Sequence, residues 1–370
     1  MIEDELAVVT EKNLIPAWSM VELTYRCNLK CSHCYIPREA SKAGKANKAI
    51  KAIKAREEGE VEQRCKYLTL NSLRNPPRWE LTTKEVKCIL DQLAEAGNLF
   101  LAFTGGEIFL RKDVFEILEY AVEKRFAVTV LTNTTLLTSS DIKKLKALKI
   151  HEISTSIYSL KAGVHDKITG VKGSFAKVMK ALKEIKKAGI SLRIKTPLMK
   201  SNFSEKRAIT VFARKNGFKM LFDPVISPKN DGSAENTEGK IGTEVLERIV
   251  KQYCTGWKYS KKDLERDFIC SAGKNFVTVN PVGEVLSCLQ IPLSAGSLRK
   301  KSFKEIWQNS AVLNKIRKMK LKNLKECAHC EDMRYCNRCP GLALLENGSL
   351  YNKSTSACEI AAIRSRYCNG

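Results

Sequence analysis

The chain lacks several features that mark whole classes of protein. Within its 370 residues no uninterrupted apolar run is long enough to span a bilayer, and no apolar segment follows a basic N-terminus. These absences exclude a membrane-spanning protein and a signal-directed secreted one. We therefore expect a cytoplasmic protein, in a compartment where thiols stay reduced. The sequence also contains no internal repeat.

Aromatic residues and negative charge are scarce as well. Aromatic residues make up only 7% of the chain, so a stacking platform for nucleic-acid bases is not evident. The 64 Lys and Arg outnumber the 40 Asp and Glu, which gives a formal net charge of +24. Iron bound by cysteine thiolates would lower this charge to roughly +20. Because the basic residues are spread along helices, we expect an acidic peptide as partner rather than nucleic acid.

Cysteine, by contrast, is abundant. Of the fourteen cysteines, three fall within eight residues near the start and seven fall in the last hundred residues. In a reducing compartment such groups more often bind metal than form disulfides. Cys65, Cys88 and Cys368 match no motif, and we expect them to be buried structural thiols.

Six apolar, strand-like segments alternate with helical ones. They begin near residues 18, 99, 126, 152, 191 and 218. This alternation predicts an α/β fold with a parallel sheet that closes partly into a barrel, whose chemistry lies on the loops after the strands. Thr82 and Glu85 form a capping box for the helix before the second strand, and Gly189 ends the helix that starts near Phe175.

Two regions interrupt the alternation. Residues 37–77 contain a Lys- and Ala-rich stretch that reads as a basic helix. It is either a solvated surface helix or an element that docks the substrate. Residues 227–240 are polar and contain glycine, which is typical of a linker leading out of the barrel.

The first cysteine group follows the first strand directly. Cys27, Cys31 and Cys34 are spaced CxxxCxxC within TYRCNLKCSHCY. Three thiolates can hold three irons of a [4Fe–4S] cube and leave the fourth iron open to an external ligand. A zinc site that borrows a distant fourth ligand fits the spacing on its own equally well.

A second motif, Gly105-Gly106-Glu107, follows the second strand. The glycines allow the backbone to approach a ligand closely, and the carboxylate can accept a hydrogen bond from an ammonium group. An ordinary turn is the alternative. Because both loops follow neighbouring strands, we expect them to face one pocket.

Together these motifs resemble the hallmarks of the radical S-adenosylmethionine (SAM) superfamily. The resemblance implies that the amino and carboxylate groups of SAM chelate the open iron. An electron from the cluster then gives a 5′-deoxyadenosyl radical that abstracts a substrate hydrogen. It places the SAM amino end on Gly105, Gly106 and Glu107, and the adenine beside His33.

The resemblance continues along the barrel. LTNTTLL around Asn133 is similar to the family's TNGTLL, with Thr134 in place of the glycine, so we expect a slightly different turn and a cofactor contact at Asn133. The segment SIYSLKAGVHDKITGVKGSF resembles the fourth-strand region of peptide-modifying members and places Ser156 on the ribose or carboxylate of SAM. Ile108 stands where the family usually has proline.

Seven C-terminal cysteines include two CxxC pairs, CAHC at 327–330 and CNRC at 336–339, with single cysteines at 270, 288 and 358. Their spacing resembles the SPASM domain, an appendage that holds two auxiliary clusters. A zinc ribbon is the alternative for CAHC and CNRC taken alone. The family pattern assigns one group to a distal cluster and the other to a proximal cluster nearer the barrel. The distal group is Cys327, Cys330, Cys336 and Cys358, and the proximal group is Cys270, Cys288 and Cys339. Either Cys254 completes the proximal group, or one iron stays open, for example to a substrate thiolate.

The resemblance therefore implies a partial (β/α)6 TIM-like barrel with a C-terminal SPASM domain carrying auxiliary Fe–S clusters. We expect an N-terminal lead over 1–17, the barrel over 18–226, a linker and bridging helix over 227–265 and the SPASM domain over 266–370. The expected cofactors are SAM, a [4Fe–4S] cluster with SAM at its open iron, and two auxiliary clusters, also of the [4Fe–4S] type.

Enzymes of this kind mostly modify ribosomally made peptides, by crosslinking, epimerisation or side-chain oxidation. We expect such a maturase, with a precursor peptide or protein as partner and flavodoxin or ferredoxin as electron donor. About seventeen residues before the first strand leave no room for a winged-helix domain, so an acidic leader would be read elsewhere or by a separate protein. Three alternatives stay open: a formylglycine maturase, although Leu289 replaces the aspartate expected after Cys288; a haem or quinone-cofactor enzyme; and a non-catalytic Fe–S or zinc protein that binds nucleic acid.

Overall fold

The computed structural model describes residues 2–37, 80–252 and 270–368. The Lys- and Ala-rich stretch, Cys65 and Cys254 lie outside the described residues. No described helix combines the length and apolar character needed to cross a membrane.

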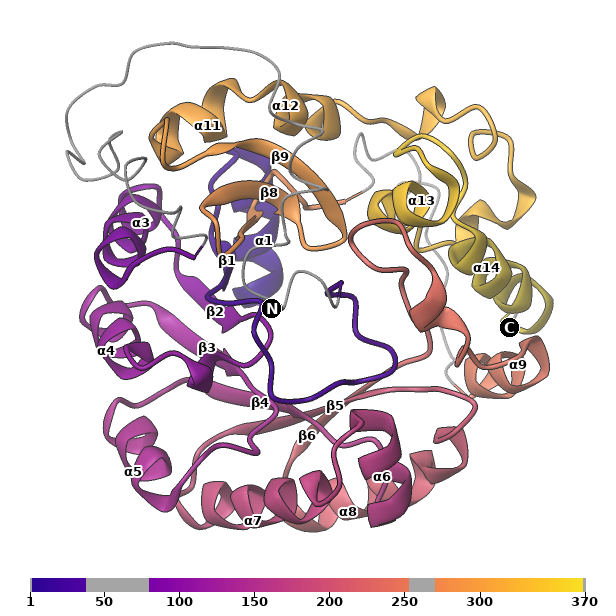
Figure 1. Ribbon diagram of the computed structural model, residues 1–370. Helices are drawn as coiled ribbons and strands as arrows, with labels where there is room; N and C mark the ends of the chain where they lie inside the picture. Colours follow the sequence, from indigo (N-terminus) through magenta and orange to yellow (C-terminus); the bar gives the residue numbers. More distant parts are fainter. Residues whose placement is uncertain (1, 38–79, 253–269, 369–370) are drawn as a thin grey trace.

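Six parallel strands form an arc in chain order, and each pairs with the next. Helices cover the convex face of the arc (Figure 1). This confirms the predicted α/β fold with its parallel sheet. The strands are β1 (Trp18–Glu22), β2 (Phe100–Thr104), β3 (Ala127–Leu131), β4 (Glu152–Ser156), β5 (Leu192–Pro197) and β6 (Lys219–Asp223). The helices of this region are α3 (Thr83–Glu95), α4 (Val114–Glu123), α5 (Ser139–Ala147), α6 (Ala162–Thr169), α7 (Ser174–Lys187) and α8 (Lys206–Asn216), with short 3-10 turns η2 (Ile108–Leu110) and η3 (Phe203–Glu205).

Local signals set the helix ends as expected. Thr82 and Glu85 form the capping box that starts α3. After α7 the chain turns at Gly189 with φ of 65°, a left-handed conformation that glycine adopts without strain.

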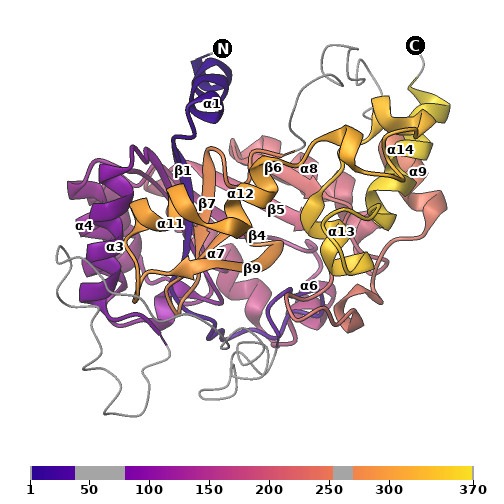
Figure 2. The same ribbon diagram turned by 90° about the horizontal axis from the view of Figure 1, so that it is seen from above.

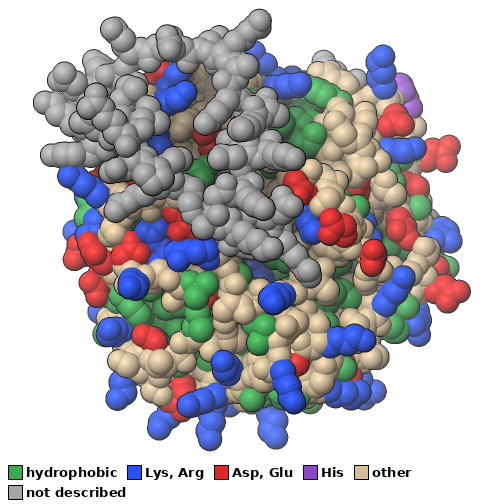
Figure 3. Space-filling model, viewed as in Figure 1, with side chains coloured by type: hydrophobic (Ala, Val, Ile, Leu, Met, Phe, Trp, Pro, Cys, Tyr) green, Lys and Arg blue, Asp and Glu red, His purple; other side chains and the backbone are tan. Residues whose placement is uncertain are grey.

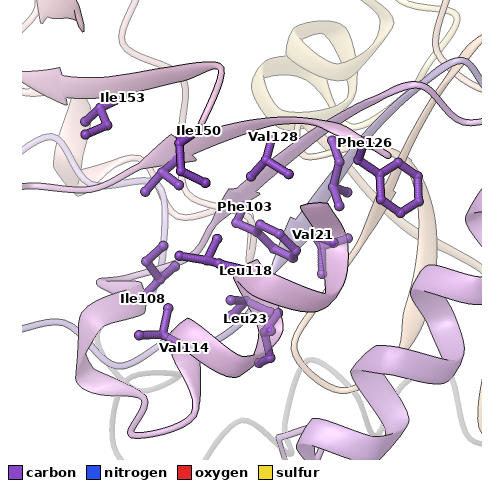
Figure 4. Packing of buried hydrophobic residues seen from close by; sticks show 14 of the residues in the cluster. Val21, Leu23, Phe103, Ile108, Val114, Leu118, Phe126, Val128, Ile150 and Ile153 are labelled. Carbon is purple, nitrogen blue, oxygen red and sulfur yellow. The ribbon is translucent and has the colours of Figure 1, made fainter. Parts of the chain in front are cut away.

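The core lies between the sheet and its covering helices. Val21, Phe103 and Val128 point from the convex face of the strands toward Leu118 of α4 (Figure 4). Each is at most 1% exposed, and burying one such side chain contributes about 1.5–3 kcal/mol. The alternate residues on the same strands point to the concave face, which is available for a ligand.

The C-terminal part extends the same sheet instead of forming a separate one. Its first strand, β7, pairs in parallel with β1 on the edge opposite β2, and two antiparallel strands follow. These strands are β7 (Phe276–Val279), β8 (Glu284–Cys288) and β9 (Ile291–Ser297). The remaining elements are α1 (Ile2–Lys12), α9 (Thr243–Lys251), α11 (Phe303–Asn309), α12 (Ala311–Arg317), α13 (Pro340–Asn347) and α14 (Thr355–Tyr367), with η4 (Glu235–Thr237), η5 (Leu321–Asn323) and η6 (Glu331–Tyr335).

Candidate cysteine ligands lie at both ends of strand β1. The Cys27 loop follows its C-terminal end, whereas α1 lies at its N-terminal end (Figure 2). Continuing the register of the β1, β7 and β8 pairs places Cys288 level with Trp18, at that same N-terminal end. Four steps along a strand span about 13 Å.

One cysteine expectation is wrong. Cys88 and Cys368 each take part in a disulfide and are not free thiols. Neither cysteine belongs to a metal-binding motif. A disulfide depends on the distance between two residues in space, so the spacing of cysteines along one segment does not predict it.

Candidate active site and auxiliary cysteine sites

The Cys27 loop is anchored to the end of α6. The backbone N–H groups of Lys30 and Ser32 donate to the carbonyls of Thr169 and Ile168 at 2.8 and 3.0 Å. Cys27 is exposed, whereas Cys31 and Cys34 are half-buried. Although Cys27 as a whole residue is exposed, the protein atoms around its sulfur keep water away from the thiolate, and this is the main cause that raises the pKa of the Cys27 thiol to about 11. Burial likewise raises the pKa of Cys31 to about 12, and the three sulfurs also act on one another electrostatically. The structure therefore brings the three thiols together.

Gly105 and Gly106 press against this loop. The Gly106 N–H donates to the carbonyl of Thr24 at 2.7 Å. A Cβ at Gly106 would lie 2.2 Å from the carbonyl oxygen of Arg26, and one at Gly105, whose φ is 144°, would lie 2.2 Å from that of Thr24. The close approach that only glycine permits is thus to the cysteine loop, where the sequence suggested approach to a ligand.

Glu107 joins the loops after β2 and β3. Its carboxylate is fully buried and accepts hydrogen bonds from Thr132 Oγ1 (2.8 Å), Asn133 N (2.7 Å) and Phe109 N (3.1 Å). Burial raises its pKa. Two of these bonds fill Oε1, so Oε2 keeps one acceptor site. No cation among the described residues forms an ion pair with this carboxylate, and a buried charge without one is costly.

Asn133 reaches the cysteine loop from the other side. Its Nδ2 donates to Asn28 Oδ1 at 2.8 Å and lies 3.9 Å from Cys27 Sγ. The next residue, Thr134, has a φ of 60°. Threonine therefore adopts the left-handed conformation that the family's glycine favours, and the turn carries the strain of a β-branched residue.

His33 and Ser156 meet at Tyr158. The rings of His33 and Tyr158 are 4.9 Å apart at 63°, and the Tyr158 hydroxyl lies 3.8 Å from Cys31 Sγ. Ser156 hydrogen-bonds to Tyr158. Burial lowers the pKa of His33 to about 4, and its Nδ1 has no partner among the described residues.

Two residues of this site escaped sequence reasoning. Asn236, in the segment expected to be only a linker, is 5% exposed and donates to the carbonyl of His33 at 3.3 Å. Lys195 is the register partner of Ser156 and lies on the concave face of β5. Among the described residues its ammonium has no hydrogen-bond or ion-pair partner, and burial lowers its pKa.

The C-terminal cysteines form two groups. Cys336 is electrostatically coupled to Cys358, Cys327 and Cys330, and burial raises its pKa to about 12. Cys339 is coupled instead to Cys270 and Cys288. The CNRC turn therefore divides its two cysteines between the groups, as the family pattern implied.

A buried cation lies within that turn. Arg338 is 7% exposed and donates to the carbonyls of Leu350 and Asn352, both at 2.6 Å. Its charge lowers the pKa of both Cys336 and Cys339, against the larger effect of burial. It thus favours thiolates in both groups.

These features agree with known proteins. Residues 21–209 match the radical SAM superfamily, and residues 270–331 match an iron–sulfur cluster-binding domain called SPASM. The chain belongs to the radical SAM superfamily. It is an enzyme, and this radical SAM enzyme uses SAM and [4Fe–4S] clusters.

Relatives of the radical SAM enzyme have several functions. The AdoMet-dependent heme synthase of Methanosarcina barkeri is 28% identical over 93% of this chain and 95% of its own length. The subtilosin biosynthesis protein AlbA of Bacillus subtilis is 27% identical over 88% of this chain and 67% of its own. SuiB of Streptococcus suis bound to the precursor peptide SuiA shares the fold, with a TM-score of 0.66 at 17% identity over 96% of this chain and 79% of that one.

The side chains of the radical SAM enzyme suit iron–sulfur clusters in their chemistry. Among the described residues, no three His, Cys, Asp or Glu side chains stand close enough to share one metal ion. In a cube each thiolate binds a separate iron, so its ligands stand farther apart. The fit rests on three groups made of thiols alone, one at the C-terminal end of β1 and two in the SPASM region.

Proposed function

We propose that this enzyme modifies a ribosomally made peptide or protein by radical chemistry. When bound, the cluster and SAM supply a 5′-deoxyadenosyl radical that removes a hydrogen atom from the substrate. The observation that carries the proposal is the three-thiol loop beside a buried, incompletely satisfied carboxylate, Glu107, at the C-terminal ends of β1 and β2. Relatives named AlbA and PqqA peptide cyclase support a peptide substrate.

In this proposal each residue has a defined part. The thiolates of Cys27, Cys31 and Cys34 hold the cluster. Glu107 accepts a hydrogen bond from the SAM ammonium at the free site of Oε2 and gains the counter-charge that it lacks. Gly105 and Gly106 hold the loops together so that this carboxylate and the cluster face the same ligand.

Residues of neighbouring strands would contact the carboxylate and the adenine of SAM. Ser156 and Lys195 are adjacent in register and offer a hydroxyl and a cation to the SAM carboxylate. Asn133 holds the loop beside Cys27, and His33 lies by the adenine as a neutral imidazole, since its pKa of about 4 is far below neutral pH.

The C-terminal thiols would hold two auxiliary clusters, within a SPASM domain over 266–370. Cys327, Cys330, Cys336 and Cys358 supply four ligands to the distal one. Cys270, Cys288 and Cys339 supply three to the proximal one, with Cys254 or a substrate thiolate as a possible fourth. Because the proximal group lies at the opposite end of β1 from the Cys27 loop, a substrate on the concave face would lie between them.

The surface fits an acidic partner. Figure 3 shows Lys and Arg side chains along the lower edge of the molecule, where α7 lies in Figure 1. The exposed lysines of α7 are Lys177, Lys180, Lys183, Lys186 and Lys187. An acidic leader or an acidic electron donor such as flavodoxin or ferredoxin would be attracted to this face.

The test is co-expression with the short peptides encoded beside the gene, followed by mass spectrometry. We expect a mass change in one peptide that depends on SAM and on intact Cys31. A Cys31→Ala enzyme is the matched control. An unchanged mass for every neighbouring peptide, with SAM cleavage intact, would contradict a peptide substrate.

A second candidate is a tetrapyrrole enzyme. It is favoured by similarity to the Methanosarcina barkeri heme synthase over nearly the full length of both chains. The unpaired Lys195 on the concave face would equally suit a propionate carboxylate. Incubation with iron-coproporphyrin III and SAM under reduction distinguishes the two, because haem formation would favour this candidate and its absence, with a modified peptide, the first.

A further inference from the structure

The turn between β8 and β9 touches two sulfurs of the proximal group. The backbone N–H of Gln290 hydrogen-bonds to Cys288 Sγ. Its side-chain Oε1 lies 3.4 Å from Cys339 Sγ and accepts the thiol proton. Gln290 therefore links a cysteine of β8 to a cysteine that comes 51 residues later in the chain.

Close packing holds Gln290 in this place. Gly341, buried in the first turn of α13, would carry a Cβ only 2.6 Å from the Gln290 carbonyl oxygen and 2.7 Å from its Cβ. The α13 N-terminus also donates to the same sulfur, since Leu342 N lies 3.5 Å from Cys339 Sγ. The carboxamide is thus confined beside Cys339 by backbone that cannot easily retreat.

Loss of the Cys339 thiol proton on iron binding changes this sulfur from a hydrogen-bond donor to an acceptor. A thiol donates to the carboxamide oxygen, but an iron-bound thiolate is an acceptor only. The oxygen would then face a negative sulfur. The terminal torsion of a glutamine is broad and nearly two-fold, so the carboxamide can turn and present its NH₂ group at the same position.

We propose that Gln290 is a positioning residue that sets the reduction potential of the proximal auxiliary cluster. Its side-chain Nε2–H donates to Cys339 Sγ while its backbone N–H donates to Cys288 Sγ. This inference rests on the proposed binding of a cluster by Cys270, Cys288 and Cys339.

The direction of the effect follows from charge. Reduction adds one electron to the cluster, and hydrogen bonds to its sulfurs stabilise the more negative state, so they raise the potential. Within the described residues, no interaction joins Gln290 to the cysteines of the distal group. The potential of the distal cluster should therefore not depend on this side chain. The distal cluster is therefore an internal control in the same molecule.

The experiment is an EPR-monitored redox titration of the full-length, anaerobically reconstituted enzyme. Gln290→Leu removes the side-chain donor and keeps the backbone one, and we expect a lower potential of the proximal cluster with an unchanged distal one. Gln290→Glu places a carboxylate beside the thiolate, and we expect a larger decrease. Gln308→Leu, at an exposed glutamine of α11, is the matched control and should change neither potential.

A second measurement needs no variant. Wild-type enzyme labelled with ¹⁵N in its glutamine side chains should show a weak ¹⁵N coupling at the reduced proximal cluster. Absence of this coupling, or equal proximal potentials in wild type and Gln290→Leu, would overturn the inference. Iron analysis separates this failure from that of the cluster assignment, because an unmodified enzyme without the proximal cluster refutes the assignment itself.

Discussion

Replacing Gly106 by alanine tests how the β2 loop supports the cysteine loop. The new Cβ would lie 2.2 Å from the Arg26 carbonyl oxygen and 2.8 Å from that of Tyr25. Both are backbone atoms, so relief requires the loops to separate by about 1 Å, since ordinary contacts begin near 3.4 Å.

Separation would weaken two backbone hydrogen bonds. Gly106 N donates to Thr24 O at 2.7 Å, and Glu107 N donates to Arg26 O at 2.8 Å. A lost hydrogen bond costs about 1 kcal/mol, and a buried group left unsatisfied costs about 1–3 kcal/mol. We therefore expect Gly106→Ala to lower the free energy of unfolding by about 2–4 kcal/mol and to displace the loop that carries Cys27.

Denaturant unfolding of the metal-free protein measures the first effect, and iron content with SAM titration measures the second. Gly163→Ala is the matched control, because no atom lies within 4 Å of its new Cβ within α6. It should stabilise the helix by up to about 1 kcal/mol. If Gly106→Ala unfolds like wild type and still binds iron and SAM normally, the two loops do not depend on this contact.

Four further predictions follow from the site and the sequence. Replacing Cys27, Cys31 and Cys34 by alanine should remove about four irons and abolish 5′-deoxyadenosine formation while the auxiliary clusters remain; SAM cleavage at the wild-type rate would contradict this. Glu107→Gln should weaken SAM binding about 10- to 100-fold by calorimetry, because a charged hydrogen bond contributes about 1.5–3 kcal/mol, and unchanged affinity would refute an ammonium contact. Burial raises the pKa of Glu22 from 4.5 to about 7, so the folded state holds its proton longer than the unfolded state and stability falls by about 3 kcal/mol as pH rises from 4.5 to 7; the metal-free Glu22→Gln variant should lack this fall in pH-dependent unfolding, and parallel pH profiles would refute it. Deleting residues 42–62 should reduce the salt dependence of substrate capture in binding titrations and leave SAM cleavage intact, whereas equal salt slopes would make this segment a cover only.

The sequence was informative where the signal is local. Apolar segments that alternate with helical ones located all six barrel strands, and Thr82, Glu85 and Gly189 marked helix ends through contacts within one turn. The pairing of β7 with β1 has no such signal, because the two strands are more than 250 residues apart and only tertiary packing brings them together.

The same limit applies to the site. Motif spacing found Cys27 and Glu107, since their neighbours in the chain define them. Asn236 and Gln290 could not be found in this way, because their parts depend on His33 and Cys339, which belong to distant segments. The assignment of Cys336 and Cys339 to different groups came from the family pattern. A CxxC pair by itself suggests that both cysteines bind at one site.

The position of β1 has a consequence for how this protein is made. One edge of β1 pairs with β2, and its other edge pairs, within the described part of the chain, with β7, which the ribosome delivers much later. Until then the nascent barrel presents an unpaired strand edge, which is a site for aggregation. A chain cut before Phe276 should therefore be insoluble although it contains every barrel strand. The β1–β7 pairing thus joins the barrel to the C-terminal part, so the solubility of the barrel depends on strands that lie outside it.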